Sequence, residues 1–175
     1  MTARLLSIVV ILGAAIHTSA QGVSGSDVPD KIKAPAGEEL ILRAHAAGSQ
    51  IYVCQAGADG KYSWTLKAPE AELRDQHGVV IGHHSAGPSW KHTDGSEIKG
   101  KAVARVDAPD ADSIPWLLLT VTDRSGNGVL SRVTSIQRVH TKGGQPPAGG
   151  CDASKANAEI RSSYTADYYF YAPAK

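Results

Sequence analysis

The segment Lys61-Tyr62-Ser63-Trp64-Thr65-Leu66-Lys67 alternates between polar and apolar side chains. Successive side chains of a β-strand point to opposite faces, so a period of two residues is typical of a strand with one face toward the core and one toward solvent. We therefore predict a half-buried strand here, with Tyr62, Trp64 and Leu66 on its inner face. The same alternation recurs on both sides of this segment.

Short alternating or apolar stretches occupy most of the chain. They lie at residues 39–46, 51–53, 72–75, 78–82, 101–106, 114–121, 129–140 and 164–171. A turn is expected at residues 47–49, and only residues 154–160 indicate a helix. Eighteen glycines and nine prolines favour turns over long helices. These patterns predict one all-β domain over residues 21–175, either a β-sandwich or a flattened β-barrel of about nine or ten short antiparallel strands with minimal helix.

Aromatic residues concentrate near the C-terminal end of the chain. Four of the six tyrosines and the single phenylalanine lie in residues 164–171, where Tyr168 and Phe170 share one face of the predicted strand. An aromatic strand can serve as a binding platform, but it more often closes a core. We expect this face to be core, together with Trp64 and Trp116.

Composition, charge and missing motifs exclude several classes of protein. Of the 175 residues, 42% are apolar and 20% are charged, which excludes disorder and collagen-like repeats. Eighteen Lys and Arg face seventeen Asp and Glu, so no net field would attract nucleic acid or an anionic membrane. The chain has no phosphate-binding loop and no His-Glu-x-x-His zinc motif. The spacing from Gly82 through Ser85 to Gly87 is one residue too long for the nucleophile turn of α/β-hydrolases.

The first twenty residues have the layout of a secretory signal peptide. Arg4 precedes twelve apolar or small residues at positions 5–16, and Thr18 and Ala20 stand at the −3 and −1 positions before Gln21. A membrane span requires about 20 apolar residues, so no membrane anchor is expected. We predict that residues 1–20 are removed and that the remaining protein is secreted or periplasmic.

The two cysteines, Cys54 and Cys151, are 97 positions apart and neither belongs to a Cys-x-x-Cys motif. Exported compartments are oxidising, so we predict that they form one structural disulfide. The alternative, a free catalytic thiol, would require a histidine nearby, and the sequence places none close to either cysteine.

One polar segment gathers chemistry-bearing residues without an apolar alternation to explain them. Four of the seven histidines lie in residues 77–92, on both sides of the turn Ser85-Ala86-Gly87-Pro88. Loops held by a rigid sheet are where binding groups usually lie, and an indole offers a flat apolar face to a ligand. The residues predicted to line the principal ligand-binding pocket are His83, Trp90, His92 and Asp94.

Adjacent residues in a strand point to opposite faces, so we expect His84 to lie nearer the surface than His83. If the histidines were protein ligands of a metal ion, the set would be His83, His84 and His92, although this spacing matches no defined metal motif. A turn-rich surface could also collect histidines without any function. A pocket lined by imidazoles should bind its ligand more weakly below about pH 6.

An ordered series of short motifs resembles a secreted bacterial and fungal family, the domain of unknown function 3455. The motifs are His84-Ser85-Ala86-Gly87-Pro88-Ser89-Trp90, Thr93-Asp94-Gly95-Ser96, Ile114-Pro115-Trp116-Leu117-Leu118, Thr141-Lys142-Gly143-Gly144-Gln145-Pro146-Pro147 before Cys151, and Tyr164-Thr165-Ala166-Asp167-Tyr168-Tyr169-Phe170-Tyr171. The likeness covers residues 28–173. It implies export and paired cysteines, and it implies no particular activity.

Three functions are compatible with the sequence. The first is an exported domain that binds a small molecule or a glycan at or near the cell envelope. The second is a metal-binding protein that uses the histidine cluster. The third is a small β-barrel enzyme in which a histidine acts with Asp94 as an acid–base pair, which would require the two side chains to be within hydrogen-bond reach.

Overall fold

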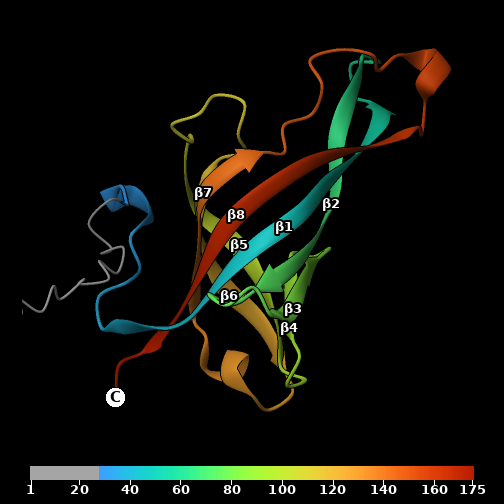
Figure 1. Cartoon of the computed structure of the whole chain (residues 1–175). Helices are drawn as coiled ribbons and strands as arrows, with labels where there is room; N and C mark the ends of the chain where they lie inside the picture. Colours follow the sequence, from blue (N-terminus) through green and yellow to red (C-terminus); the bar gives the residue numbers. More distant parts are fainter. Residues whose placement is uncertain (1–27) are drawn as a thin grey trace, which may run out of the picture.

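The computed structural model describes residues 28–175, and the predicted signal peptide lies outside them. Within this part of the chain eight antiparallel strands follow one another in sequence order around a closed barrel (Figure 1). The strands are β1 (Glu38–Ala56), β2 (Tyr62–Arg74), β3 (Val80–Ser85), β4 (Ser89–His92), β5 (Glu97–Val106), β6 (Trp116–Ser125), β7 (Ser135–Gly143) and β8 (Glu159–Pro173). Antiparallel pairing of β8 with β1 closes the barrel and leaves the sheet without an open edge.

The all-β prediction is confirmed, but the number of strands is eight in the described residues, not nine or ten. Two predicted interruptions lie inside strands: β1 runs through residues 47–49, and β2 runs without a break from residue 62 to residue 74. Gly48 marks a close approach of two backbones. A Cβ atom at this position would lie 2.1 Å from the carbonyl oxygen of Glu70. A glycine inside a strand therefore permits tight β1–β2 packing here and does not end the strand.

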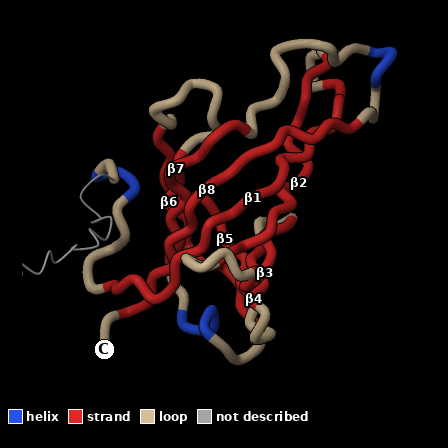
Figure 2. Tube along the Cα trace, in the orientation of Figure 1, coloured by secondary structure: helices blue, strands red, loops and turns tan. Residues whose placement is uncertain are grey.

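The helix predicted for residues 154–160 is also wrong. Residues 28–175 contain three short 3-10 helices, η2 (Asp30–Ile32), η3 (Val129–Arg132) and η4 (Ala153–Lys155), drawn in blue in Figure 2. Strand β8 begins at Glu159, separated from the end of η4 by three residues. The predicted strand at residues 129–140 begins only at Ser135, because η3 occupies its first residues.

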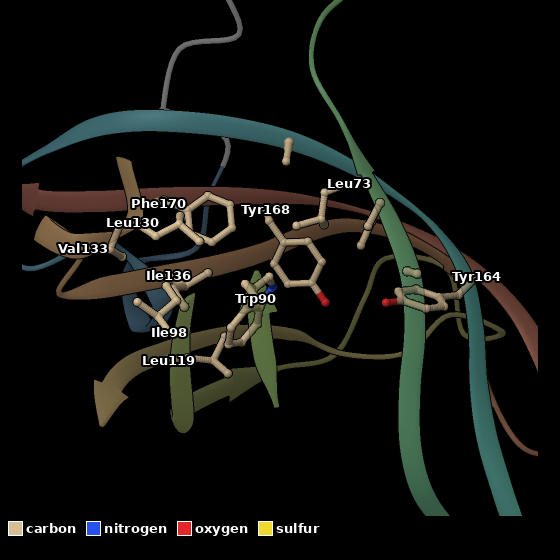
Figure 3. Packing of buried hydrophobic residues seen from close by; sticks show 14 of the residues in the cluster. Leu73, Trp90, Ile98, Leu119, Leu130, Val133, Ile136, Tyr164, Tyr168 and Phe170 are labelled. Carbon is tan, nitrogen blue, oxygen red and sulfur yellow. The ribbon is translucent and has the colours of Figure 1, made fainter. Parts of the chain in front are cut away.

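The inward side chains of the strands form the main core, shown in Figure 3. Its largest fully buried members are Trp90, Tyr168 and Phe170, and the indole of Trp90 meets the other two rings edge to face at centroid distances of 5.6 and 6.4 Å. Leu130 and Val133, from η3 and the residue after it, fill one end of the barrel. The barrel is therefore closed by apolar packing at the η3 end, which is the lower end in Figure 1.

A second apolar cluster lies on the outside of the barrel. Ile32 of η2 packs there against Trp116, Val139 and Tyr169, and the side chain of Gln137 donates a hydrogen bond of 2.7 Å to the carbonyl oxygen of Ile32. Strand β6 is thus covered on both faces, which explains why residues 114–121 are so apolar.

The predicted core position of Trp64 is wrong, whereas Trp116, Tyr168 and Phe170 are buried. The first half of β2 continues past the barrel together with β1, at the upper right of Figure 1. Trp64 lies half-buried on this extension and donates a hydrogen bond of 2.9 Å to the carbonyl oxygen of Gly149. An alternating pattern predicts a strand with two different faces, but it does not say what covers either face.

The disulfide between Cys54 and Cys151 is present, and Cys54 is fully buried. It attaches the connection between β7 and β8 to the extended end of β1, where Cys54 also exchanges backbone hydrogen bonds of 2.9 Å with Ala158 and Asn157. No helix within residues 28–175 is long and apolar enough to cross a membrane.

We expect the double substitution Cys54→Ala, Cys151→Ala to lower the free energy of unfolding by about 2–4 kcal/mol, because a cross-link over so long a loop restricts the unfolded chain. Urea unfolding of the variant and of the wild type, each with and without reductant, measures this. Reductant should destabilise only the wild type. Equal midpoints for the oxidised and the reduced wild type would contradict the prediction.

Candidate functional site

The histidine-rich segment forms the short hairpin of β3 and β4. The register pairs His84 with Trp90 and His83 with Lys91. His84 is 2% exposed and Trp90 is 1% exposed, whereas His83 lies on the outside of the barrel. The adjacent histidines therefore face opposite sides as expected, but in the reverse orientation. A period of two shows only that neighbouring side chains point to opposite faces of the sheet. The position of the hairpin in the closed barrel decides which of the two points inward.

A cavity of about 410 Å³ lies inside the barrel above this hairpin, and we refer to it as the barrel cavity. It reaches solvent beside Leu66, which is 52% exposed, and it lies away from the end filled by η3. Three rings line its inner part: His84, Trp90 and Tyr168. Its apolar walls are Leu66, Pro69, Pro88, Ala102, Leu117 and Leu119.

His84 lines the barrel cavity as a neutral imidazole. Its ring stacks on the indole of Trp90 with centroids 4.5 Å apart, and its Nδ1 donates a hydrogen bond of 2.8 Å to the carbonyl oxygen of Ser89. Burial lowers the pKa of His84 to about 3. The histidine that does face the cavity thus stays uncharged at neutral and mildly acidic pH, so its titration gives no reason for weaker binding below about pH 6.

Polar groups enter the same cavity from three other strands. They are Gln50 of β1, Arg138 of β7 and the hydroxyl of Tyr168 of β8. Gln50 is 2% exposed, and its side-chain nitrogen Nε2 has no hydrogen-bond partner in the part of the chain that the structure describes. The guanidinium of Arg138 donates from Nε and Nη2 to the carbonyl oxygen of Pro115, at 3.2 and 2.9 Å. No carboxylate within residues 28–175 forms an ion pair with Arg138.

Two tyrosine hydroxyls meet in the upper part of the barrel. Figure 3 shows the hydroxyls of Tyr164 and Tyr168 pointing toward one another; the two interact, and the hydroxyl of Tyr168 also interacts with Arg138. Burial raises the pKa of both hydroxyls, while the positive charge of Arg138 acts in the opposite direction on each. Both side chains are therefore neutral hydroxyl groups that can still donate a hydrogen bond.

His92 and Asp94 do not line the barrel cavity. His92 is the last residue of β4 and Asp94 lies in the turn that follows it, with His92 Nδ1 and Asp94 Oδ2 3.1 Å apart. The carboxylate of Asp94 accepts hydrogen bonds from the backbone and the hydroxyl of Ser96, at 2.9 and 2.6 Å, and from the backbone of Val129, at 2.8 Å. A Cβ atom on Gly128 would lie 2.3 Å from this carboxyl group. Asp94 thus links the β4–β5 turn to η3, and these hydrogen bonds use both oxygens of its carboxylate.

Of the four side chains predicted to share a pocket, the structure places only Trp90 at the barrel cavity. The three histidines of the predicted metal set do not converge either, since His83 points outward and His84 inward. Across residues 28–175 no group of three or more His, Cys, Asp or Glu side chains is arranged to hold a metal ion.

A different cluster of titratable groups lies on the outer face, where β7, β8 and β1 adjoin. Asp167 contacts Nδ1 of His45 at 2.8 Å with one carboxylate oxygen and Nδ1 of His140 at 2.9 Å with the other. These residues are far apart in sequence, so the contact could be predicted only with knowledge of the barrel topology. The arrangement ties three neighbouring strands together.

The sequence contains a weak signal for the polar residues of the cavity. Arg138 is two residues after the buried Ile136, and Gln50 is an even number of residues after the buried Ala44 and Ala46, so each occupies an inward position of its strand. A polar residue at an inward position of an alternating strand is the signal that could have indicated them.

One family model, described as protein of unknown function (DUF3455), matches residues 35–172. The chain belongs to this family. The match runs from just before β1 to near the end of β8, so the family is defined over the whole barrel. No curated protein and no solved structure matches the chain.

Substituting Asp94 by Ala should lower the free energy of unfolding by about 1–3 kcal/mol, because buried or half-buried donors of Ser96 and Val129 lose their acceptor. These hydrogen bonds hold the pKa of Asp94 below its usual value of 3.8. A depressed pKa in the folded state adds stability above the unfolded pKa, and this stability is lost as the pH falls through the folded pKa. The difference between variant and wild type should therefore be full at neutral pH and shrink below about pH 4.

Chemical unfolding at several pH values measures this difference. The matched control is Thr93→Ala at the exposed neighbouring position. A structural role for Asp94 is refuted if both variants keep the stability of the wild type at neutral pH.

His84 should make the stability of the wild type fall in mild acid. Its folded pKa lies below the unfolded value of 6.5, so below pH 6.5 the unfolded chain binds a proton that the folded protein does not. The free energy of unfolding should fall by up to about 1.4 kcal/mol per pH unit in this range from this group. The His84→Phe variant, which keeps an aromatic ring against Trp90, should lack this contribution.

Urea unfolding between about pH 7.5 and pH 4.5 tests this sign. The control is His83→Phe, which changes the exposed neighbour and should keep the slope of the wild type. Identical slopes for the wild type and His84→Phe would show that His84 is not buried as a neutral side chain.

Proposed function

We propose that the protein is an exported binding protein that takes up a small, mainly apolar molecule in the barrel cavity. The observation that carries this proposal is the cavity itself: about 410 Å³, open to solvent and lined mainly by apolar side chains and three rings at one end of a closed barrel. This volume lies in the range of small-molecule sites, and the interior of an eight-stranded barrel is wide enough for one small ligand.

The ring arrangement supports a compact ligand over a glycan. The indole of Trp90 is 1% exposed, with one face stacked on His84 and its edges against Tyr168 and Phe170. It cannot offer an open face to an extended sugar chain. A small molecule that enters the cavity would instead meet Leu117, Leu119 and the ring of Tyr168.

Binding is also favoured over catalysis by a His–Asp pair. The carboxylate of Asp94 already accepts three hydrogen bonds, and neither it nor His92 reaches the barrel cavity. The proposed export rests on the signal-peptide layout of residues 1–20 and agrees with the disulfide between Cys54 and Cys151.

The neutral fluorescent probe N-phenyl-1-naphthylamine tests the proposal. It should bind the wild type with increased fluorescence, and Ala102→Trp should weaken this binding by about tenfold or more, because the indole fills part of the cavity. The matched control is Val103→Trp, since Val103 is 57% exposed and does not line the cavity. The proposal fails if the probe does not bind the wild type or if both variants bind it equally well.

A further inference from the structure

The barrel cavity presents hydrogen-bond donors without matching acceptors. Gln50 Nε2 and Trp90 Nε1 are buried and have no hydrogen-bond partner within residues 28–175, whereas the hydroxyl of Tyr168 interacts with Tyr164 and Arg138. These three side chains line the cavity together with Arg138. Buried polar groups are normally paired, so two unpaired donors on side chains that line one cavity indicate that a ligand supplies the acceptors.

The charges around the cavity indicate which kind of hydrogen-bond acceptor a ligand would carry. Its lining includes two cationic side chains, Lys67 and Arg138, and no Asp or Glu. Lys67 forms an ion pair with Glu159 outside the cavity. Arg138 lies in register with Tyr168, deeper in the barrel, and its partners within residues 28–175, the carbonyl oxygen of Pro115 and the hydroxyl of Tyr168, are both neutral. One uncompensated positive charge therefore remains at the cavity.

We infer that the ligand is a carboxylic acid with a compact apolar or aromatic body, and that its carboxylate binds Arg138 with Gln50 beside it. This inference rests on the proposed function of the cavity. A carboxylate carries a single negative charge and accepts several hydrogen bonds at once, which fits one guanidinium and the amide Nε2 of Gln50. The apolar body then lies against Trp90, Tyr168 and the leucine walls.

A phosphate or sulfate monoester fits less well. A phosphate monoester brings nearly two negative charges and three strongly hydrated oxygens, and such groups usually bind at several cations or at a row of backbone N–H groups. The cavity offers one uncompensated cation within mainly apolar walls. A monocarboxylate therefore matches both its charge and its polarity.

The test compares 2-naphthoate with 2-naphthamide, its neutral analogue of nearly the same shape, by isothermal titration calorimetry. The wild type should bind 2-naphthoate about tenfold more tightly than 2-naphthamide, because only the acid pairs with the guanidinium. Arg138→Met should abolish this preference and leave the affinity for 2-naphthamide nearly unchanged. Arg138→Lys keeps the charge without the two-pronged geometry and should keep part of the preference.

The matched control is Arg132→Met, which removes an arginine of η3 at the closed end of the barrel. It should keep the full preference of the wild type for the acid. Circular dichroism melts establish that each variant is folded. If Arg138→Met does not fold, the salt dependence of binding to the wild type is measured instead. Raising sodium chloride from about 20 mM to about 500 mM should weaken binding of 2-naphthoate and leave binding of 2-naphthamide unchanged.

Equal affinities of the wild type for the two probes, or a preference that survives in Arg138→Met, would overturn the inference. Binding of N-phenyl-1-naphthylamine that is sensitive to Ala102→Trp would then still support a binding cavity for a neutral ligand. Absence of binding by both naphthalene compounds overturns the carboxylate inference as well, and the neutral probe decides separately whether the cavity binds anything.

Discussion

The pairing of β8 with β1 is the constraint on which the rest of the structure depends. It joins strands that are more than a hundred residues apart, from Glu38 opposite Pro173 to Val53 opposite Glu159, and it turns an open meander into a closed barrel. Once the barrel is closed, every second side chain of each strand points into one shared interior. The core, the cavity and the orientation of the β3–β4 hairpin all follow from this closure.

The interior is filled unevenly, and this produces a cavity at one end only. At the η3 end, Leu130, Val133 and Phe170 are packed without exposure, and the hydrogen bonds of Asp94 hold η3 against the β4–β5 turn. Toward the other end the inward positions are occupied by Gln50, Arg138 and small or peripheral side chains such as Ala102. A well-packed end thus supports a hollow end whose mainly apolar walls carry a few buried polar groups.

The hollow end includes features that a purely structural core would avoid. Leaving a buried donor unpaired costs about 1–3 kcal/mol, and the barrel cavity is lined by two side chains with such donors, Gln50 and Trp90, next to a cation. Departures from good packing and complete hydrogen bonding tend to occur at functional sites. The disulfide lies on the β1 extension, where it holds the β7–β8 connection. It stabilises the fold without contributing a group to the cavity.

The sequence by itself determined the all-β class, the disulfide and the apolar character of β6, because each depends on a local pattern or on the chemistry of one residue type. It also determined that His83 and His84 face opposite sides. Only the tertiary structure decided which of them points inward, that Trp64 lies on an extension and not in the core, and that Gln50, Arg138 and Tyr168 meet in one cavity. These residues come from β1, β7 and β8, and a period of two assigns a side chain to one of two faces without saying what the face encloses. The enclosure arises when distant strands pair, and that pairing is encoded in no single segment of the chain.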